Sequence, residues 1–231
     1  MVALVEPGWS AADSQFCGGS LIALRWVLTA AHCVARRDGT PMRPERVDAL
    51  TGRARLSRRG GERIPVASIE LAPGKHDVAL VELTEASTYE AVLLADADDR
   101  DLVTGGRMAV VIGWGNTVDV NPKDHHADGR PADDLLMATV PILPQHRCEA
   151  IMGVKRVTKG APPELCAGGI RKGGADACSG DSGGPLLVGS RFGYVQIGVV
   201  SWGDGCDLPW SPGVYARVAS LADWIATTTT S

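Results

Sequence analysis

Residues 177–185 read ACSGDSGGP and place Ser182 among glycines, directly after Asp181. A serine hydroxyl is a weak nucleophile at neutral pH, so it needs a nearby base that takes its proton. Glycines suit such a site because no side chain shields their backbone N–H groups and they tolerate unusual backbone angles. A glycine-flanked serine is nevertheless more often part of an ordinary loop. Whether Ser182 is a nucleophile therefore depends on finding its partners elsewhere in the chain.

Two other segments supply candidate partners. Residues 28–33, LTAAHC, contain His32, and residues 76–80, HDVAL, contain Asp77. Histidine suits the role of base because its unperturbed pKa near ~6.5 lets it take and return a proton. A buried carboxylate on the other ring nitrogen would fix the tautomer and stabilise the imidazolium. Each residue alone has a plainer interpretation, but the three together, in the order His, Asp, Ser, indicate a serine nucleophile with its base.

That order is the one found in chymotrypsin, and it differs from the orders in subtilisin and the α/β-hydrolases. Further stretches carry the same resemblance: CGGSLI at residues 17–22, VIGWGN at 111–116, LCAGG at 165–169 and GVVSWGDGCDLPWSPGVYARV at 198–218. From about residue 16 to residue 226, the chain resembles a trypsin-like serine protease of the chymotrypsin family. The resemblance implies a serine endopeptidase that cleaves after Arg or Lys by a Ser-His-Asp acyl-enzyme mechanism.

The resemblance also implies an all-β fold of two packed six-stranded antiparallel Greek-key β-barrels with a C-terminal α-helix. Residues 1–100 would form the first barrel, without its usual N-terminal segment, and would carry His32 and Asp77. Residues 101–231 would form the second barrel and carry Ser182, the S1 pocket and the helix.

The pattern of residues independently favours this fold class. Short apolar runs such as 19–28 and 194–202 fit strands, and the 28 glycines and 14 prolines lie between such runs as turn residues. Only residues 219–226 have the apolar spacing of a helix. The net charge of −4 gives no support for nucleic-acid binding, and no apolar run approaches the ~20 residues that would span a membrane.

The resemblance assigns further site residues. The backbone N–H groups of Gly180 and Ser182 would form the oxyanion hole, and Ser201 would support Asp77 by a hydrogen bond. Asp176 would form the floor of the S1 pocket, where a buried carboxylate favours a substrate Arg or Lys; the plainer alternative is a solvated loop acid. Ala177 replaces a hydroxyl-bearing residue common in trypsins, which leans towards Arg over Lys. The S1 set implied by the resemblance is Asp176, Ala177, Ser201, Trp202, Gly203 and Gly213.

Six cysteines in a loop-rich β chain suggest disulfides and an oxidising compartment, although the count alone leaves the pairing open. The resemblance implies the pairs Cys17–Cys33, Cys148–Cys166 and Cys178–Cys206, a set similar to that of bacterial secreted members. Residues 1–10, MVALVEPGWS, do not have the features of a signal peptide. We expect a secreted protein whose signal peptide is not part of this sequence.

Asp181 is expected to be the activation-pair carboxylate. In the resembling family, cleavage of a zymogen exposes a new N-terminus, usually Ile/Val-Val-Gly-Gly, which pairs with this aspartate. No such tetrapeptide precedes Cys17. A buried carboxylate without its partner is strongly unfavourable, so we expect Asp181 to turn outward and the Gly180 amide to leave the oxyanion hole.

Three interpretations of the chain follow. The first is an active secreted protease whose sequence here starts at an internal Met. The second is a zymogen-like or weakly active protein, and the third is a non-catalytic binding module with a protease fold. The partners expected are peptide or protein substrates with Arg or Lys and protein protease inhibitors, with no nucleic acid, membrane or cofactor. A monomer is the default.

Two polar segments receive no site assignment. His125 and His126, beside Asp124 and Asp128, could be imagined as a metal site, but adjacent histidines in a polar loop are more often solvent-exposed. The basic run at residues 53–63, RARLSRRGGER, is a poor calcium site because it has a single Glu. That run fits a solvated β-hairpin better than a binding site for an acidic partner. No metal is expected.

Overall fold

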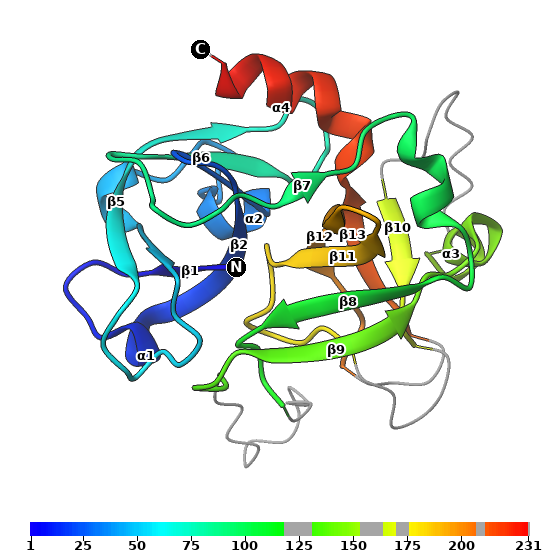
Figure 1. Cartoon of the computed structure of the whole chain (residues 1–231), viewed down its shortest axis with the longest axis horizontal. Coiled ribbons are helices and arrows are strands. Elements are labelled where there is room, and N and C mark those ends of the chain that lie inside the picture. Colours follow the sequence, from blue (N-terminus) through cyan, green and yellow to red (C-terminus); the bar gives the residue numbers. More distant parts are fainter. Residues whose placement is uncertain (118–130, 153–163, 170–175, 207–210, 231) are drawn as a thin grey trace.

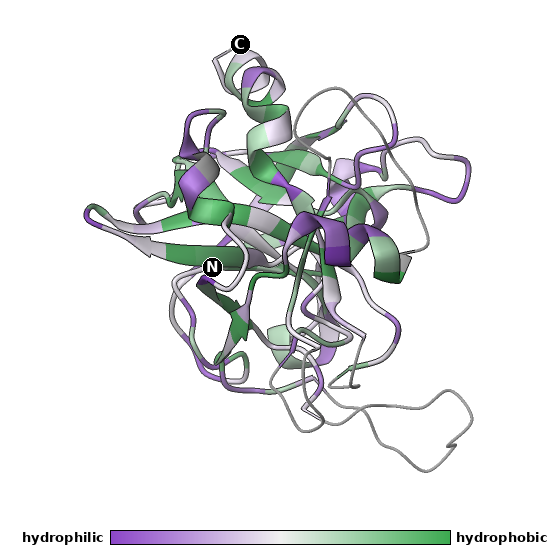
Figure 2. Cartoon of the chain, turned by 90° about the vertical axis from the view of Figure 1, so that its right-hand side faces the viewer, coloured by the Kyte–Doolittle hydropathy of each residue, from purple (hydrophilic) through white to green (hydrophobic). Residues whose placement is uncertain are grey.

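The structure is a computed structural model that describes residues 1–117, 131–152, 164–169, 176–206 and 211–230. Within these residues two β-structures lie next to each other, and a helix at the C-terminal end lies across the top of the view in Figure 1. The hydrophobic colouring in Figure 2 is concentrated on the strands, in keeping with their apolar sequences. The predicted all-β fold with a C-terminal helix is confirmed.

Six antiparallel strands close into the first barrel, in the order β1-β2-β3-β6-β5-β4 around its wall. The pairing of β1 with β4 completes the circle. Along β5, buried and exposed residues alternate through much of the strand, as expected where one face lines a core. The strands of this barrel are β1 (Val2–Val5), β2 (Gln15–Ala23), β3 (Trp26–Thr29), β4 (Asp48–Thr51), β5 (Glu62–Leu71) and β6 (Ala79–Leu83).

The apolar run at residues 19–28, which the sequence suggests as strand, contains a hairpin. β2 ends at Ala23, β3 begins at Trp26, and these two residues face each other across the pair. The connecting Leu24 is 57% exposed although it is apolar. No glycine or proline marks this turn in the sequence, which is why turn chemistry does not reveal it.

The second β-structure is a curled sheet with strand order β10-β13-β12-β11-β8-β9 and one further strand, β7, beside β12. β7 is parallel to β12, whereas the other pairs are antiparallel. It comes from residues before position 100, so a short segment of the N-terminal part joins this sheet; the domain division at residue 100 stays a prediction. The strands are β7 (Leu93–Leu94), β8 (Met108–Gly113), β9 (Leu136–Pro141), β10 (Glu164–Ala167), β11 (Pro185–Ser190), β12 (Gly193–Trp202) and β13 (Gly213–Arg217).

The C-terminal helix connects the two halves. α4 follows the second sheet in sequence, yet Leu221 and Ile225 lie in the same buried cluster as first-barrel residues such as Leu80. The predicted helix at residues 219–226 is divided between a 3₁₀ turn and a helix that continues to Thr229. The helices are α1 (Ala11–Ser14), α2 (Ala31–Val34), α3 (Gln145–Met152) and α4 (Ala222–Thr229), with 3₁₀ turns η1 (Pro44–Arg46), η2 (Asp99–Val103) and η3 (Val218–Leu221).

Three disulfides link segments that are distant along the chain. The pairs are Cys17–Cys33, Cys148–Cys166 and Cys178–Cys206, which are the pairs that the resemblance implies. Among the described residues, no helix has the length and apolar character needed to cross a membrane.

Candidate active site

Asp77 holds His32 by two hydrogen bonds. His32 lies in α2, and Asp77 comes just before β6. The Nδ1 atom of His32 is 2.8 Å from Asp77 Oδ2, and the backbone N–H of His32 donates to Asp77 Oδ1 over 2.9 Å. When Nδ1 carries the proton of this bond, Nε2 is the ring nitrogen with a free lone pair. The pair therefore fixes both the position and the tautomer that a general base requires.

Ser201 contributes a third hydrogen bond to the same carboxylate. Its hydroxyl donates to Asp77 Oδ2 from β12, a strand of the second sheet. Partial burial acts to raise the pKa of Asp77, but the hydrogen bonds from His32 and Ser201 outweigh it and leave this pKa below its ordinary value. Asp77 is therefore ionised at neutral pH, as a carboxylate that stabilises an imidazolium must be.

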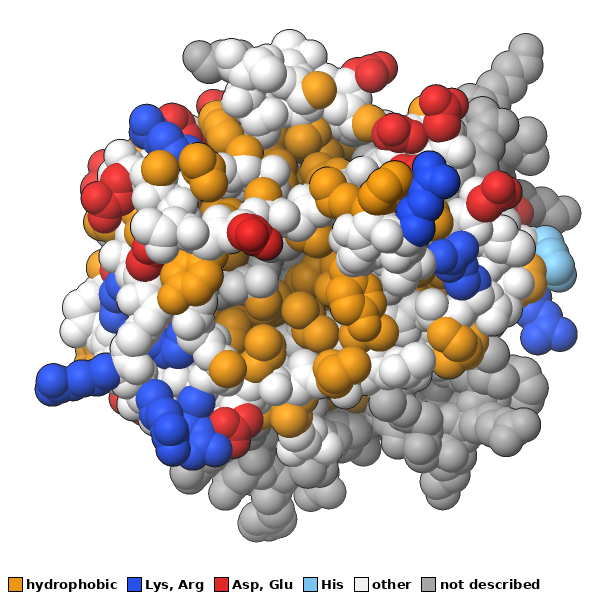
Figure 3. Space-filling model, in the orientation of Figure 1, with side chains coloured by type: hydrophobic (Ala, Val, Ile, Leu, Met, Phe, Trp, Pro, Cys, Tyr) orange, Lys and Arg blue, Asp and Glu red, His pale blue; other side chains and the backbone are white. Residues whose placement is uncertain are grey.

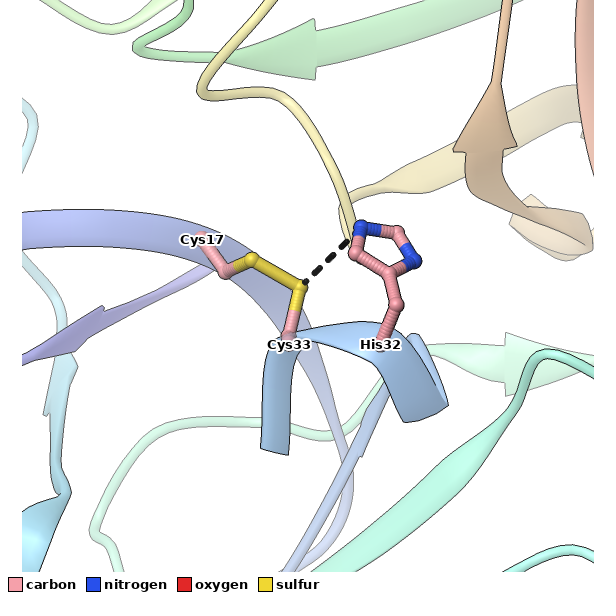
Figure 4. A group of neighbouring side chains, drawn as sticks. All are labelled: Cys17, His32 and Cys33. Carbon is pink, nitrogen blue, oxygen red and sulfur yellow. Dashed lines mark hydrogen bonds between the residues drawn. A yellow bond between two sulfur atoms is a disulfide. The ribbon is translucent and has the colours of Figure 1, made fainter. Parts of the chain in front are cut away.

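The other ring nitrogen of His32 faces the Cys17–Cys33 disulfide. Figure 4 shows the three side chains, with His32 Nε2 lying 3.8 Å from Cys33 Sγ. One nitrogen or sulfur from each residue lies within 4.8 Å of the others. Both sulfurs are joined in the disulfide, so neither is the thiolate that metal binding needs. The oxidised protein therefore offers no metal centre here.

Ser182 is tied to the segment that carries His32. The carbonyl of Ser182 accepts a hydrogen bond of 2.7 Å from Gly18 N–H, and Gly18 is next to Cys17, the disulfide partner of Cys33. A Cβ on Gly183 would lie 2.2 Å from Thr29 Oγ1, so the chain after Ser182 lies directly against the strand that leads to α2. Within the described residues, Ser182 Oγ makes no hydrogen bond. The structure thus brings Ser182 to the region of His32 without a bond between the two side chains.

The candidate oxyanion hole is formed by a turn whose carbonyl groups are all occupied elsewhere. Ser179 O accepts from Asn116 N–H at 2.8 Å, Gly180 O accepts from the side-chain amide of Gln15 at 3.0 Å, and Ser182 O accepts from Gly18. Gly180 has φ +99°, a conformation that favours glycine. The N–H groups of Gly180 and Ser182 donate to no atom of the described residues. These two donors remain available for an oxyanion.

Asp181 does not turn outward, so that expectation is wrong. Asp181 is only 9% exposed. Its Oδ1 accepts a hydrogen bond from Gly115 N–H at 2.8 Å, and its Oδ2 accepts one from Cys178 N–H at 2.9 Å. Burial raises the pKa of Asp181, and the two backbone hydrogen bonds act against this rise. No ion pair within the described residues includes Asp181. Two backbone N–H groups therefore offset part of the free-energy cost of burying this charge, a cost that a cation was expected to offset.

The carboxylate of Asp181 explains why the stretch VIGWGN at residues 111–116 contains two glycines. A Cβ on Gly113 would lie 2.0 Å from Asp181 Oδ1, and one on Gly115 would lie 2.3 Å from Oδ2. Any larger residue at either position would displace the carboxylate. Both glycines therefore provide the space that Asp181 occupies.

The candidate S1 residues meet at the start of β13. Asp176 is half-buried, and its Oδ1 accepts from Ala177 N–H at 2.8 Å. A Cβ on Gly213 would lie 3.1 Å from that same oxygen, and one on Gly203 would lie 3.9 Å from Gly213 Cα. The carboxylate of Asp176 and these two glycines are thus neighbours, which is the arrangement that the resemblance implies.

Tyr215 is a candidate pocket residue that sequence reasoning missed. Its hydroxyl is buried and has no hydrogen-bond partner among the described residues. A Cβ on Gly213 would lie 3.1 Å from both the Tyr215 hydroxyl and Asp176 Oδ1, so all three lie together. Burial and the charge of Asp176 raise the pKa of Tyr215, which keeps the phenol neutral. The period of two along a strand could have revealed it, since Gly213 and Tyr215 share one face of β13.

The other residues that the sequence suggests for the site do not all lie together, and some lie outside the described residues. Ala177 is partly buried against the core of the second sheet, and Trp202 is 50% exposed at the end of β12. The histidines and aspartates at residues 124–128 lie outside the described residues. So do residues 170–175 and 207–210, which flank the candidate S1 residues in sequence.

Known proteins resemble this chain over nearly its whole length. The family model described as Trypsin matches residues 3–225. A trypsin of Saccharopolyspora erythraea is 36% identical over 228 residues, covering 96% of this chain and 88% of that protein. Trypsin 5G1 of Aedes aegypti is 36% identical over 222 residues, covering 92% of this chain and 75% of the relative. Trypsin eta of Drosophila erecta is 34% identical over 224 residues, covering 94% of this chain and 79% of the relative.

A family match over nearly the whole chain and relatives of this similarity identify the type of enzyme. Its substrates are peptides or proteins. The chain belongs to the trypsin family of serine proteases.

Proposed function

We propose that the protein is an endopeptidase that hydrolyses peptide bonds after Arg or Lys by an acyl-enzyme mechanism. The observation that carries the mechanism is the pair of hydrogen bonds from His32 to Asp77, at 2.8 and 2.9 Å. With Nδ1 bonded to Asp77, Nε2 of His32 is left as the base. Ser182 is linked to the segment of His32 through Gly18, whose N–H donates to the Ser182 carbonyl and which lies next to the Cys17–Cys33 disulfide.

The chemistry follows from the roles of these groups. Ser182 Oγ attacks the substrate carbonyl carbon while His32 Nε2 takes the hydroxyl proton, and the N–H groups of Gly180 and Ser182 stabilise the oxyanion. The C–N bond then breaks, and His32 returns the proton to the leaving amine. A water molecule attacks the acyl-enzyme by the same route, which releases the acid and restores Ser182.

Specificity for a basic side chain rests on Asp176. A half-buried carboxylate attracts a guanidinium or ammonium group that enters a pocket walled by Gly203 and Gly213, since glycines leave room for a long side chain. The Tyr215 hydroxyl offers a further hydrogen-bonding group beside it. Ala177 carries no hydroxyl, which favours Arg over Lys.

Asp181 is proposed as the receptor for a cationic N-terminal amine. Its buried carboxylate has a raised pKa and no ion pair within the described residues, so an ammonium group would stabilise its ionised form. The second candidate is a zymogen-like protein of low activity, whose Asp181 would have no cationic partner. Three disulfides favour secretion, as an oxidising compartment preserves them, and protein protease inhibitors are proposed partners of a monomer.

The test is hydrolysis of matched chromogenic peptides that end in Arg, Lys, Phe or Leu by the oxidised protein. The Arg and Lys peptides should be cleaved and the others should not, and cleavage after Phe or Leu would contradict the role of Asp176. Ser182→Ala should abolish turnover and retain binding of benzamidine, a small Arg-like cation. If the protein is zymogen-like, the dipeptide Ile-Val should raise the rate by supplying an ammonium group to Asp181, and Asp181→Asn should remove this response.

A further inference from the structure

A cavity lined by arginines lies in the turn between β4 and β5, away from the candidate S1 residues. It has a volume of about 370 Å³ and is lined by residues 52–55 and 58–61 together with Asp134. Figure 3 shows basic side chains gathered at this edge of the molecule. Its four arginines are Arg53, Arg55, Arg58 and Arg59.

The turn that forms this cavity is held in place by its own hydrogen bonds. Arg53 Nε donates to Gly60 O at 2.8 Å, which closes the turn on itself. Leu56 is buried, and its N–H donates to Asp133 O at 2.9 Å. Leu135 N–H donates to Ala54 O at 2.6 Å from the other side. The cavity is therefore shaped before any ligand arrives, which lowers the entropy lost on binding.

The acidic groups beside the cavity are already occupied. Arg55 binds both oxygens of Asp134, at 2.5 and 2.7 Å. Asp133 accepts from the N–H and the hydroxyl of Ser57, at 2.7 and 2.6 Å. Arg58 and Arg59 are exposed and form no close ion pair within the described part of the chain, although the charge of Arg58 adds to the lowering of the Asp134 pKa. The cavity thus has cationic groups left over on a protein whose net charge is −4.

An aromatic ring borders the same turn. A Cβ on Gly52 would lie 1.8 Å from Tyr89 Cζ, so the ring of Tyr89 rests on the backbone of Gly52. Tyr89 is 40% exposed. Because Gly52 also lines the cavity, Tyr89 lies at its border and offers an apolar contact to a ligand there.

We propose that this cavity binds an acidic peptide segment of a protein substrate or partner, with carboxylates paired to Arg58 and Arg59. Guanidinium groups pair with carboxylates through two parallel hydrogen bonds. A compact cavity of about 370 Å³ suits a short acidic segment better than an extended polyanion, because Arg58 and Arg59 are adjacent in the chain and present few cationic groups.

The test uses the oxidised Ser182→Ala protein, which cannot cleave the probe. A fluorescein-labelled peptide of consecutive glutamates with glycine ends is titrated and followed by anisotropy. We expect saturable binding that weakens as salt is raised and becomes at least ~10-fold weaker in Arg58→Glu/Arg59→Glu. The matched control is Arg43→Glu/Arg46→Glu, which changes two arginines at a separate cavity of about 300 Å³ and should leave the affinity within about twofold of the parent's. Circular dichroism checks that each variant is folded.

Three results would overturn the proposal. One is no saturable binding of the peptide, and another is equal weakening in both double variants, which would reflect overall charge. The third is tighter binding of a sulfated polysaccharide or an oligonucleotide than of the peptide, lost in the same Arg58 and Arg59 variant. Because binding is measured without catalysis, a failure here is separate from a failure of the proposed protease activity.

A different observation concerns Gln15, which lies at the start of β2. Gln15 is 8% exposed, and its side-chain nitrogen donates to Gly180 O at 3.0 Å. Its side-chain oxygen is buried without a hydrogen-bond partner in the described residues. The peptide group between Gly180 and Asp181 is thereby held at both ends, because Asp181 N–H donates to Cys178 O at 2.9 Å. This peptide group stands between the two candidate oxyanion donors.

We infer that Gln15 is a positioning residue that keeps the Gly180 and Ser182 N–H groups directed at the oxyanion. This inference rests on the proposed function. A side chain that acts in this way should affect the transition state more than the bound substrate.

Gln15→Leu, which lacks the donor, should lower kcat about 10-fold or more with little change in KM. A peptide aldehyde, which forms a tetrahedral oxyanion, should bind more weakly by a similar factor, whereas benzamidine should bind unchanged. In Gln15→Glu the acid form can still donate, so activity should fall as pH rises through the pKa of the new acid. Gln145→Leu is the matched control, because Gln145 bonds Arg217 instead of residues 179–182, and its kcat should equal that of the parent.

The inference fails if Gln15→Leu retains full kcat or weakens benzamidine and aldehyde equally. If the parent protein itself has no activity, the proposed protease function fails instead. The Gln15 inference is then decided by the amide resonance of Gly180 in NMR spectra. That resonance should shift in Gln15→Leu and stay in place in Gln145→Leu, and an unshifted Gly180 resonance in Gln15→Leu would overturn it.

Discussion

At the scale of single residues, the candidate site depends on how hydrogen bonds offset the cost of burying the carboxylates of Asp77 and Asp181. Asp77 receives side-chain and backbone hydrogen bonds that lower its pKa, while Asp181 receives two backbone N–H groups that only partly offset burial. The two acids therefore respond to pH in opposite ways. Gly113 and Gly115 matter for the same reason, because they leave space for Asp181.

Replacement of Gly113 by Ala should destabilise the protein. Its Cβ would lie 2.0 Å from Asp181 Oδ1, and overpacking of this kind costs about 1–3 kcal/mol. Urea unfolding followed by tryptophan fluorescence measures the change, and peptide hydrolysis should fall with it. Gly189→Ala is the control, since nothing lies within 4 Å of its Cβ position. Equal stability of the two variants would show that Asp181 moves aside freely.

The stability of the protein should depend on the ionisation of Asp181. The pKa of this acid is raised in the folded state, so between its unfolded value of about 3.9 and its folded value the folded protein binds more protons. The free energy of unfolding of the parent, relative to that of Asp181→Asn, should therefore fall as pH rises through this window. The ionisation of Asp77 itself, by contrast, should add no pH dependence to the free energy of unfolding above about pH 5, because its lowered pKa leaves the carboxyl group ionised in the folded and the unfolded state. Unfolding in urea at several pH values gives both curves, and parallel curves for parent and Asp181→Asn would contradict this account.

At the scale of elements, short segments rather than long helices position the site. α2 is four residues long and carries His32, and it is fixed to β2 by the Cys17–Cys33 disulfide. β12 delivers Ser201 to Asp77, and β13 places Tyr215 beside Asp176. An element of four residues has little stability of its own, so α2 depends on this covalent link.

Removal of the Cys17–Cys33 disulfide should affect both stability and catalysis. In Cys17→Ala/Cys33→Ala the loss of a link over 16 residues should lower the free energy of unfolding by about 3 kcal/mol. Because His32 lies beside Cys33, kcat should fall as well. Cys148→Ala/Cys166→Ala spans 18 residues and should show a similar loss of stability with a smaller loss of kcat. Thermal unfolding and peptide hydrolysis measure the two effects, and an equal loss of kcat would contradict a local role for the first disulfide.

At the scale of the whole molecule, sequence patterns predict a great deal. The order of His32, Asp77 and Ser182 carries the family resemblance, which in turn implies the cysteine pairs, and the short apolar runs indicate an all-β chain. What they miss depends on contacts between distant segments. The hairpin at Leu24 has no turn residue, β7 is two residues long, and the role of Tyr215 appears only when β13 is seen beside Asp176.

The position of Asp181 could not be predicted for a related reason. Its burial depends on the backbone N–H groups of Gly115 and Cys178, which a sequence does not place in space. Reasoning from charge alone expects a side chain that escapes to solvent, whereas peptide dipoles compensate part of the cost of burying it.

Because α4 packs on the first barrel, the two halves should be coupled through it. Ile225 is 5% exposed and shares a cluster with first-barrel residues, so Ile225→Ala should lower the free energy of unfolding by about 2–5 kcal/mol. Leu24→Ala, at a site 57% exposed, should change it by less than ~0.5 kcal/mol. Both follow from urea unfolding. Similar values for the two variants would mean that α4 contributes little to the whole molecule.

The connection from His32 through Cys33, Cys17 and Gly18 to Ser182 has a consequence for how the protein matures. A chain in which Cys33 has joined another cysteine lacks the covalent link between β2 and the short helix that carries His32. Hydrolytic activity should then be higher in molecules that have completed the correct oxidation, so that activity reports on the folding of the chain.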